Sequence, residues 1–310
     1  MIRSPEKLPA LIPAQAVRTG RRRLSRDERL AYLLLLPALG AVFVIVTIPF
    51  VLVVIQSISA DDGTLVGLSN YSRALSNPLL IDAIRATAVY SVIVLPLEIL
   101  LGLSFALLVH RTVRPLGLRA AIYVLAILPL VVPPVAIGVV ARLVYAPSYG
   151  VLNVILERLG VIHQEINWLG DPNLAMLAVA SVDIWQWTPF VYLVLFSGLQ
   201  TVPRESVEAA QIDGADWWAQ FRYIDLFYLR PLFLLIIFFR LADVLRVFDH
   251  IFILTGGGPG TTTQLLSLYM YRVEFKFFDG GQAAALAVMV LVSFSVLYRL
   301  ISRALPLEKA

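Results

Sequence analysis

Four charged residues alternate in sign at three-residue steps within a long apolar stretch. They are Arg240, Asp243, Arg246 and Asp249. Residues three apart are neighbours on a helix, so this ladder can neutralise itself, and charges inside membrane spans are costly and usually functional. Two interpretations stay open: an ion network facing a second chain, or the polar lining of a path that hydrogen-bonds the hydroxyl groups of a passing molecule. Arg240 and Arg246 hint at an anionic molecule, and the paired carboxylates weaken that hint.

A second candidate group lies in an earlier apolar stretch. Asp183, Trp185 and Gln186 place an aromatic face beside a carboxylate and an amide, and Trp187 follows directly. Aromatic faces with adjacent hydrogen-bonding groups suit sugar rings. Tryptophan is also a common anchor at the membrane surface, so both roles remain open. Glu98, in another apolar stretch, has no partner that the sequence reveals.

The composition indicates that lipid surrounds these residues. Of 310 residues, 59% are hydrophobic and 15% are charged, whereas soluble domains are nearer half apolar and a quarter charged. The absence of cysteine excludes a disulfide framework, thiolate catalysis and cysteine-ligated metal sites. A membrane span needs about 20 mostly apolar residues. The sequence predicts six spans over about 31–55, 83–109, 118–144, 174–199, 231–254 and 283–301. Bends are expected at prolines inside or at the ends of these spans, namely Pro37, Pro49, Pro96, Pro129, Pro133, Pro134 and Pro189.

Basic residues gather on one side of the predicted spans. They occupy the N-terminal segment, the turn after the second span, the segment between the fourth and fifth spans, and the C-terminal tail. Because such residues remain in the cytoplasm, both termini are expected there. We expect a basic cytoplasmic segment over 1–30, a six-span domain over 31–303 and a cytoplasmic tail over 304–310. We interpret the N-terminal basic cluster as a topology signal rather than a nucleic-acid site. Its members are Arg18, Arg21, Arg22, Arg23, Arg26 and Arg29.

The segment 201–230 predicts a helix–turn–helix on the cytoplasmic side. Pro203 fits the start of a helix, and Glu205 and Glu208 lie in its first turns, where the helix dipole favours negative charge. Gly214 permits a sharp reversal. Apolar residues then recur at helical spacing, which gives the segment small and apolar surface that a simple loop does not need. These residues are Trp217, Trp218, Phe221 and Ile224.

This segment resembles the signature loop of permeases in binding-protein-dependent ABC importers. The family pattern is Glu-Ala-Ala, three residues, Gly, nine residues, Ile, one residue and Leu-Pro. Phe227 stands where the family usually has proline, and Pro231 follows where many members have one. The stretches 67–71 and 248–259 resemble sugar permeases of the maltose and glycerol-phosphate type, within the MetI-like permease superfamily. The residues that match the loop pattern are Glu208, Ala209, Ala210, Gly214, Ile224 and Leu226.

The resemblance implies an all-α membrane helix bundle, the permease of a type I importer in the bacterial inner membrane. It implies a second homologous permease, two ATP-binding cassette subunits and an extracytoplasmic solute-binding protein as partners, with a sugar, polyol or glycoside as cargo. ATP and Mg²⁺ would belong to the ATPase subunits, and this chain would bind no cofactor. The residues expected to couple to the ATPase are Glu208, Ala209, Ala210, Asp213, Gly214 and Ile224. The residues expected along the substrate path are Asp183, Trp185, Gln186, Arg240, Asp243, Arg246 and Asp249.

Other functions remain as alternatives or are excluded. The same machine could carry a polyamine, phosphate or an amino acid. A stand-alone secondary transporter is a further alternative, although no inverted repeat is visible. The glycine-rich stretch 256–260 is not a phosphate-binding loop, because no Gly-Lys-Ser/Thr follows it. An enzyme is not expected, and the sequence predicts no catalytic residue, no metal site and no nucleic-acid partner.

Overall fold

The computed structural model describes residues 26–60 and 62–304. The N-terminal basic residues Arg18, Arg21, Arg22 and Arg23, and the tail beyond residue 304, lie outside the described residues, as do the side chains of Arg26 and Arg29. The described residues are helical, apart from turns and one isolated bridge between Ser59 and Leu65. The chain divides into two compact units, residues 1–52 and 53–310, which are taken separately below.

The first unit contains one apolar helical run. It consists of α1 (Arg26–Val42), a π-helical turn η1 (Phe43–Thr47) and the opening of α2 (Ile48–Ser57). The run from Tyr32 to Ser57 is 26 residues long and apolar enough to cross a membrane. The span predicted over 31–55 is therefore confirmed as a helix of spanning length.

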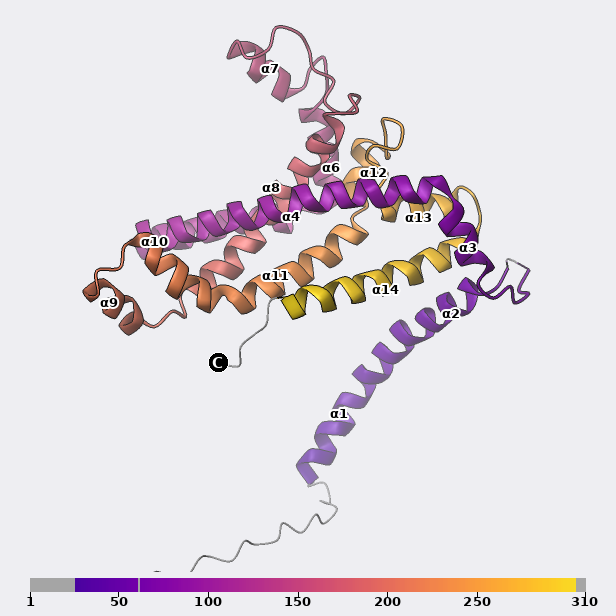
Figure 1. Ribbon diagram of the computed structural model, residues 1–310, viewed down its shortest axis with the longest axis horizontal. Coiled ribbons are helices and arrows are strands. Elements are labelled where there is room, and N and C mark those ends of the chain that lie inside the picture. The colour runs from indigo at the N-terminus through magenta and orange to yellow at the C-terminus, as the bar shows by residue number, and fades with distance from the viewer. Residues whose placement is uncertain (1–25, 61, 305–310) are drawn as a thin grey trace, which may run out of the picture. The chain divides into compact units, whose positions relative to one another are not determined.

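Four long helices build the second unit: α4 (Pro78–Thr112), α8 (Ala175–Leu199), α11 (Leu226–Arg246) and α14 (Gly280–Ala304). Figure 1 shows them side by side, with α4 packed on α8 and α11, and α11 packed on α14. The predicted spans 83–109, 174–199 and 283–301 fall within α4, α8 and α14. Buried aliphatic and aromatic side chains of α4, α8 and α11 form a continuous core.

Shorter helices connect the long ones, and some of them lie at the two ends of this unit. In Figure 1, α9 and α10 lie together at one end, whereas α3 and α13 lie at the other. Their arrangement brings residues that are far apart in sequence to the same end of the bundle. Their bounds are α3 (Ser69–Ser76), α5 (Leu116–Val131), α6 (Pro134–Val144), α7 (Val151–Arg158), α9 (Arg204–Ile212), α10 (Trp217–Gln220), η2 (Phe221–Asp225), α12 (Asp249–Leu254) and α13 (Leu266–Phe275).

Two of the predicted spans are broken helices. The predicted span 118–144 is the pair α5 and α6, which meet at an angle of 92°. Pro133 and Pro134 explain this break, because proline lacks a backbone N–H and disfavours helix in the residue before it. The predicted span 231–254 also differs from the structure. Its helix α11 begins earlier and ends at Arg246, and α12 starts only at Asp249, after the extended residue Val247.

The number of spans is only partly settled by length and composition. Within the described residues, four helices are long and apolar enough to cross a membrane, and the bent pair α5–α6 makes a fifth if it forms one span. The helix α11 has 21 residues but carries Arg230, Arg240, Asp243 and Arg246. A total of six therefore stays a prediction.

Candidate functional site

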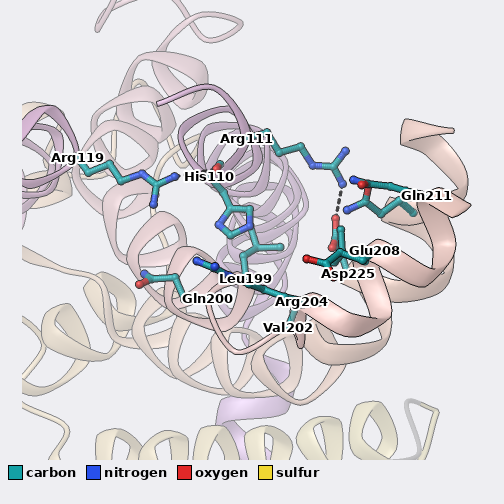
Figure 2. A pocket seen from close by; sticks show the side chains of 12 residues that line it. His110, Arg111, Arg119, Leu199, Gln200, Val202, Arg204, Glu208, Gln211 and Asp225 are labelled. Carbon is teal, nitrogen blue, oxygen red and sulfur yellow. Dashed lines mark hydrogen bonds and ion pairs between the residues drawn. The ribbon is translucent and has the colours of Figure 1, made fainter. Parts of the chain in front are cut away.

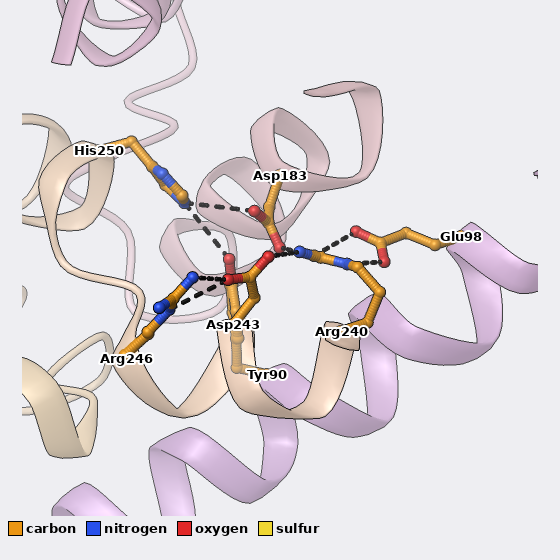
Figure 3. Close-up of polar contacts among 7 residues, drawn as sticks. All are labelled: Tyr90, Glu98, Asp183, Arg240, Asp243, Arg246 and His250. Carbon is orange, nitrogen blue, oxygen red and sulfur yellow. Dashed lines mark hydrogen bonds and ion pairs between the residues drawn. The ribbon is translucent and has the colours of Figure 1, made fainter. Parts of the chain in front are cut away.

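Arg240 lies at the centre of a buried ionic cluster that joins three helices. Its Nε and Nη2 atoms donate to the two carboxylate oxygens of Glu98 on α4, at 2.6 and 2.7 Å. Nη2 also donates to Asp183 on α8 at 2.8 Å. The guanidinium carbon lies 4.7 Å from the ring centroid of Trp187, a cation–π contact. Figure 3 shows how the two carboxylates approach the guanidinium from different helices.

Three of the four residues in the predicted charge ladder, Arg240, Asp243 and Arg246, contact one another in the structure. Asp243 accepts from Arg240 Nη1 at 3.3 Å and from Arg246 Nη2 at 2.6 Å. Arg240 is 1% exposed, whereas the Arg246 side chain is 80% exposed, so the ladder runs from the core to the surface (Figure 3). Asp249 makes no ion pair with any described residue, because the helix ends at Arg246 and Asp249 starts α12 on a new axis.

A histidine and a tyrosine extend the cluster on the side opposite Glu98. His250 Nε2 lies 3.9 Å from an oxygen of Asp183 and 3.3 Å from the hydroxyl oxygen of Tyr90. Both side chains are buried. The cluster therefore ties α4, α8, α11 and α12 together through polar contacts in a region that is otherwise apolar (Figure 3).

A cavity of about 380 Å³ opens beside the cluster, at the two helix breaks. Its wall includes Pro134 from the break between α5 and α6, and Val247 from the break between α11 and α12. Gln186 of α8 lines the cavity, and its Nε2 donates to the Val132 carbonyl at 3.3 Å. That carbonyl lies at the bend, where it would otherwise lack a helical partner. Non-helical backbone at membrane depth is found where it lines a cavity or is buried in protein.

All of the predicted substrate-path residues except Trp185 line this cavity. Asp183 and Gln186 line the cavity together with Arg240, Asp243, Arg246 and Asp249. Trp185 does not: it is 56% exposed and borders a separate apolar cavity with Pro129 and Pro189. Trp187 is the tryptophan that reaches the cluster. Successive helix residues point about 100° apart, so only one of two tryptophans separated by two positions can lie on the cavity side.

Glu98 is the partner that sequence reasoning missed. It is fully buried on α4 and binds Arg240, which is 142 positions away. No local spacing connects the two residues. The available signal was the presence of an unpaired carboxylate within an apolar stretch, which requires a cation from another helix.

The second candidate site is the segment between α8 and α11. Pro203 precedes α9, whose C-terminus is closed by Gly214 with φ +78° and by a hydrogen bond from Ala215 N to Ala210 O at 2.8 Å. This is a Schellman-type cap, which favours glycine. Asp216 then caps α10 by accepting from Ala219 N at 2.7 Å. The predicted helix–turn–helix is therefore present.

The predicted coupling residues lie along this helix–turn–helix. Glu208 and Ala209 are exposed on α9, and Ala210 is half-buried. Asp213 is the exposed C-cap residue of α9, and Ile224 lies half-buried in η2. Ile212 is 86% exposed, and both Trp217 and Trp218 are also more than half exposed.

Arg111, at the end of α4, joins the segment to the bundle. Its guanidinium forms an ion pair with the buried Asp225 of η2 and lies 5.0 Å from the ring centroid of Trp217. Figure 2 shows this pair beside a cavity of about 710 Å³, which is bordered by Glu208 and Gln211 of α9 and by His110 and Arg119. Arg111 was expected to report only the membrane orientation, so its contact with this segment is a further residue that the sequence did not reveal.

Within residues 26–60 and 62–304, no group of three or more His, Asp or Glu side chains is placed to hold a metal ion. The cavity near Arg240 offers charged, amide and aromatic groups that can bind a polar molecule. The segment around α9 offers an exposed surface that can bind another protein.

Comparison with known proteins relates the chain to membrane transport. Residues 98–306 match the family described as the binding-protein-dependent transport system inner membrane component. The chain belongs to this family. This permease is 36% identical over 286 residues to the trehalose/maltose transport system permease protein MalF of Thermococcus litoralis, covering 90% of this chain and 95% of that protein.

Further relatives agree with this assignment. The permease is 32% identical to the sulfoquinovosyl glycerol transport system permease protein SmoG of Agrobacterium fabrum, covering 85% of this chain and 86% of that one. Its fold matches a chain of a bacterial ABC transporter involved in the import of the acidic polysaccharide alginate. The TM-score is 0.77 at 24% identity, with 90% of this chain and 96% of the other covered. The expected all-α permease fold is confirmed, and the protein is a multi-pass transport component rather than an enzyme.

Proposed function

We propose that this permease is one of two homologous membrane subunits of an ATP-driven importer whose cargo is a sugar or a related polyol or glycoside. The names of its relatives, which specify trehalose/maltose and sulfoquinovosyl glycerol transport, support this cargo class. In this proposal two ATP-binding cassette subunits hydrolyse ATP with Mg²⁺, and an extracytoplasmic solute-binding protein delivers the cargo. The permease itself binds no cofactor.

The observation that carries the proposal is the exposed surface of α9 and α10. An exposed isoleucine and two exposed tryptophans lie within a few residues of each other at one end of the bundle (Figure 1). Exposed apolar side chains gathered in this way mark a protein interaction site. We assign it to the ATPase subunit, with Glu208, Ala209 and Gly214 on the docking surface and Asp213 at its edge.

The connections of this segment provide a route for motion. The segment follows α8 after a turn at residues 200–203, and η2 continues into α11 without a break. Both helices contribute to the cavity beside Arg240 through Gln186, Asp183 and Asp243. A displacement of α9 by the ATPase would therefore move two helices that line the proposed substrate path.

The membrane orientation follows from the same proposal. If α9 binds a cytoplasmic ATPase, then the end of the bundle that holds α9, α10 and Arg111 faces the cytoplasm. Six spans with both termini in the cytoplasm satisfy this arrangement and place the basic segments on the inner side.

The test is co-purification of the tagged permease from detergent-solubilised membranes of cells that express the complete transporter. Gly214→Asp adds bulk and charge to the proposed docking surface at a residue with φ +78°. We expect the variant to insert normally and to retain about tenfold less ATPase subunit than the native chain, which corresponds to a modest loss of binding energy.

Gly160→Asp provides the matched control. Gly160 has φ +69° and, like Gly214, no atoms within 4 Å of an added Cβ, but it lies after α7, far from α9 in the chain. The control should retain the ATPase subunit. Normal retention by Gly214→Asp would refute the proposed docking surface, whereas a native complex without any ATPase subunit would refute the ATP-driven mechanism.

A further inference from the structure

Gln186, which lines the cavity beside Arg240, has a side-chain oxygen without a hydrogen-bond partner among the described residues. Gln186 is 2% exposed and uses its Nε2 atom for the Val132 carbonyl. Its Oε1 atom is buried and has no hydrogen-bond partner among the described residues. A buried carbonyl oxygen without a partner loses the free energy of its hydration. A cargo molecule that donates a hydrogen bond at this point would supply the missing partner.

Arg240 is held by carboxylates of the chain itself, which use four of its five N–H donors. Its Nε and Nη2 atoms bind Glu98, Nη2 also binds Asp183, and Nη1 binds Asp243. One face of its guanidinium lies against Trp187. All three nitrogen atoms are therefore engaged by carboxylates that belong to the chain itself.

Carboxylates outnumber guanidinium groups in the wall of this cavity. Three aspartates (Asp183, Asp243 and Asp249) and two arginines (Arg240 and Arg246) border it. Glu98 lies behind Arg240 and adds a further negative charge. Like charges repel strongly where the surroundings exclude water, so an anionic group entering here would meet a net negative wall.

Arg246 also lines the cavity: its Nε and Nη2 atoms bind Asp243, and its Nη1 atom has no partner among the described residues. Its side chain is 80% exposed and lies at the outer end of the ladder. Its charge is already offset by Asp243, so we assign it to the network rather than to the cargo.

We propose that the cargo carries no negative charge where it meets this wall, and that Gln186 Oε1 accepts a hydrogen bond from one of its hydroxyl groups. This inference rests on the proposed function and selects an uncharged polyhydroxyl compound over a uronate, sulfonate or phosphate ester. Gln186 is then a specificity-determining residue, and Arg246 is not a counter-ion for the cargo.

The experiment measures uptake by proteoliposomes that contain the complete transporter, with and without ATP on the nucleotide-binding side. The neutral probes are trehalose, maltose and glucosylglycerol, and the anionic probes are glucuronate and sulfoquinovosyl glycerol. We expect ATP-dependent uptake of at least one neutral probe and of neither anionic probe. Gln186→Met should lower uptake about tenfold, whereas Arg246→Gln should change it by less than about threefold.

Trp185→Phe is the control for Gln186→Met, because Trp185 is adjacent on α8 but borders the other cavity. It should leave uptake unchanged. The inference is overturned by ATP-dependent uptake of an anionic probe, by a loss of more than about tenfold in Arg246→Gln, or by the lack of ATP-dependent uptake of every neutral probe. Uptake of a neutral probe that is independent of ATP would instead overturn the proposed function.

Discussion

Glu98 and Arg240, which are 142 positions apart, form a bidentate ion pair, in which both carboxylate oxygens accept hydrogen bonds from the same guanidinium. The pair is fully buried between α4 and α11. Because Asp183 and Asp243 also contact Arg240, the cluster holds more negative than positive charge. This imbalance determines which member is hardest to replace.

Replacing the arginine should therefore destabilise the permease more than replacing the glutamate. Arg240→Gln leaves Glu98 and Asp183 buried without their cation, and breaking a buried pair in this way costs about 3–5 kcal/mol. Glu98→Gln leaves Arg240 with two carboxylates and should cost less. The thermal unfolding midpoint of the purified complex should fall furthest in Arg240→Gln.

Arg246→Gln serves as the exposed control for this series. It breaks an ion pair at the surface, where such pairs contribute about 0–1 kcal/mol, so its midpoint should lie near that of the native complex. A midpoint for Glu98→Gln at or below that of Arg240→Gln would show that the charge imbalance does not govern stability.

Arg111→Gln should loosen the segment around α9 without unfolding the bundle. The change removes the cation from the buried Asp225 and the contact with Trp217. Leaving such a group unpaired costs about 1–3 kcal/mol, so amide hydrogen exchange over residues 204–225 should accelerate by roughly tenfold or more. Mass spectrometry of the exchanged protein measures this.

Arg114→Gln is the matched control for Arg111. Arg114 is exposed and makes no ion pair with a described residue, so exchange over 204–225 should match the native rate. Equal protection in the Arg111 variant would indicate that α9 is held by its flanking helices alone.

Gly102→Ala should disturb the crossing of α4 and α8. An added Cβ would lie 2.6 Å from Val191 Cγ1 and 3.0 Å from the backbone nitrogen of Tyr192. Overpacking of this kind costs about 1–3 kcal/mol, even though alanine is the better helix former. The unfolding midpoint should fall, while Gly117→Ala, where nothing lies within 4 Å, should leave it unchanged or raise it. A midpoint for Gly102→Ala equal to the native value would contradict the close crossing.

Single-cysteine labelling tests the orientation, since the native chain contains no cysteine. Glu165→Cys lies in the loop after α7, and Glu205→Cys lies on α9; both positions are exposed. A membrane-impermeant maleimide added to intact spheroplasts should label Glu165→Cys and should label Glu205→Cys only after permeabilisation. The reverse pattern would place α9 outside the cell.

The sequence predicted local features well and distant contacts poorly. The helices containing the predicted spans 83–109, 174–199 and 283–301 are present, because apolar length is a local property. Bends were expected at seven prolines: the break at Pro133 and Pro134 is present, whereas Pro37, Pro96, Pro129 and Pro189 lie inside helices. The break after Arg246 was not expected, because neither Val247 nor Phe248 is a residue type that interrupts a helix. The sequence alone could not predict which of Trp185 and Trp187 faces the cavity, because that depends on which face of α8 is covered by α4.

The buried cluster also bears on how the chain is made. Synthesis proceeds from the N-terminus, so α4 with Glu98 and α8 with Asp183 leave the ribosome before α11 does. When Arg240 enters the bilayer, the carboxylates of Glu98 and Asp183 have already been inserted and can pair with it. The guanidinium therefore need not face hydrocarbon without a partner. For α11 as the predicted fifth span, the order of the helices along the chain makes stable integration depend on the earlier helices. A nascent chain that lacks either carboxylate is therefore expected to insert this helix poorly.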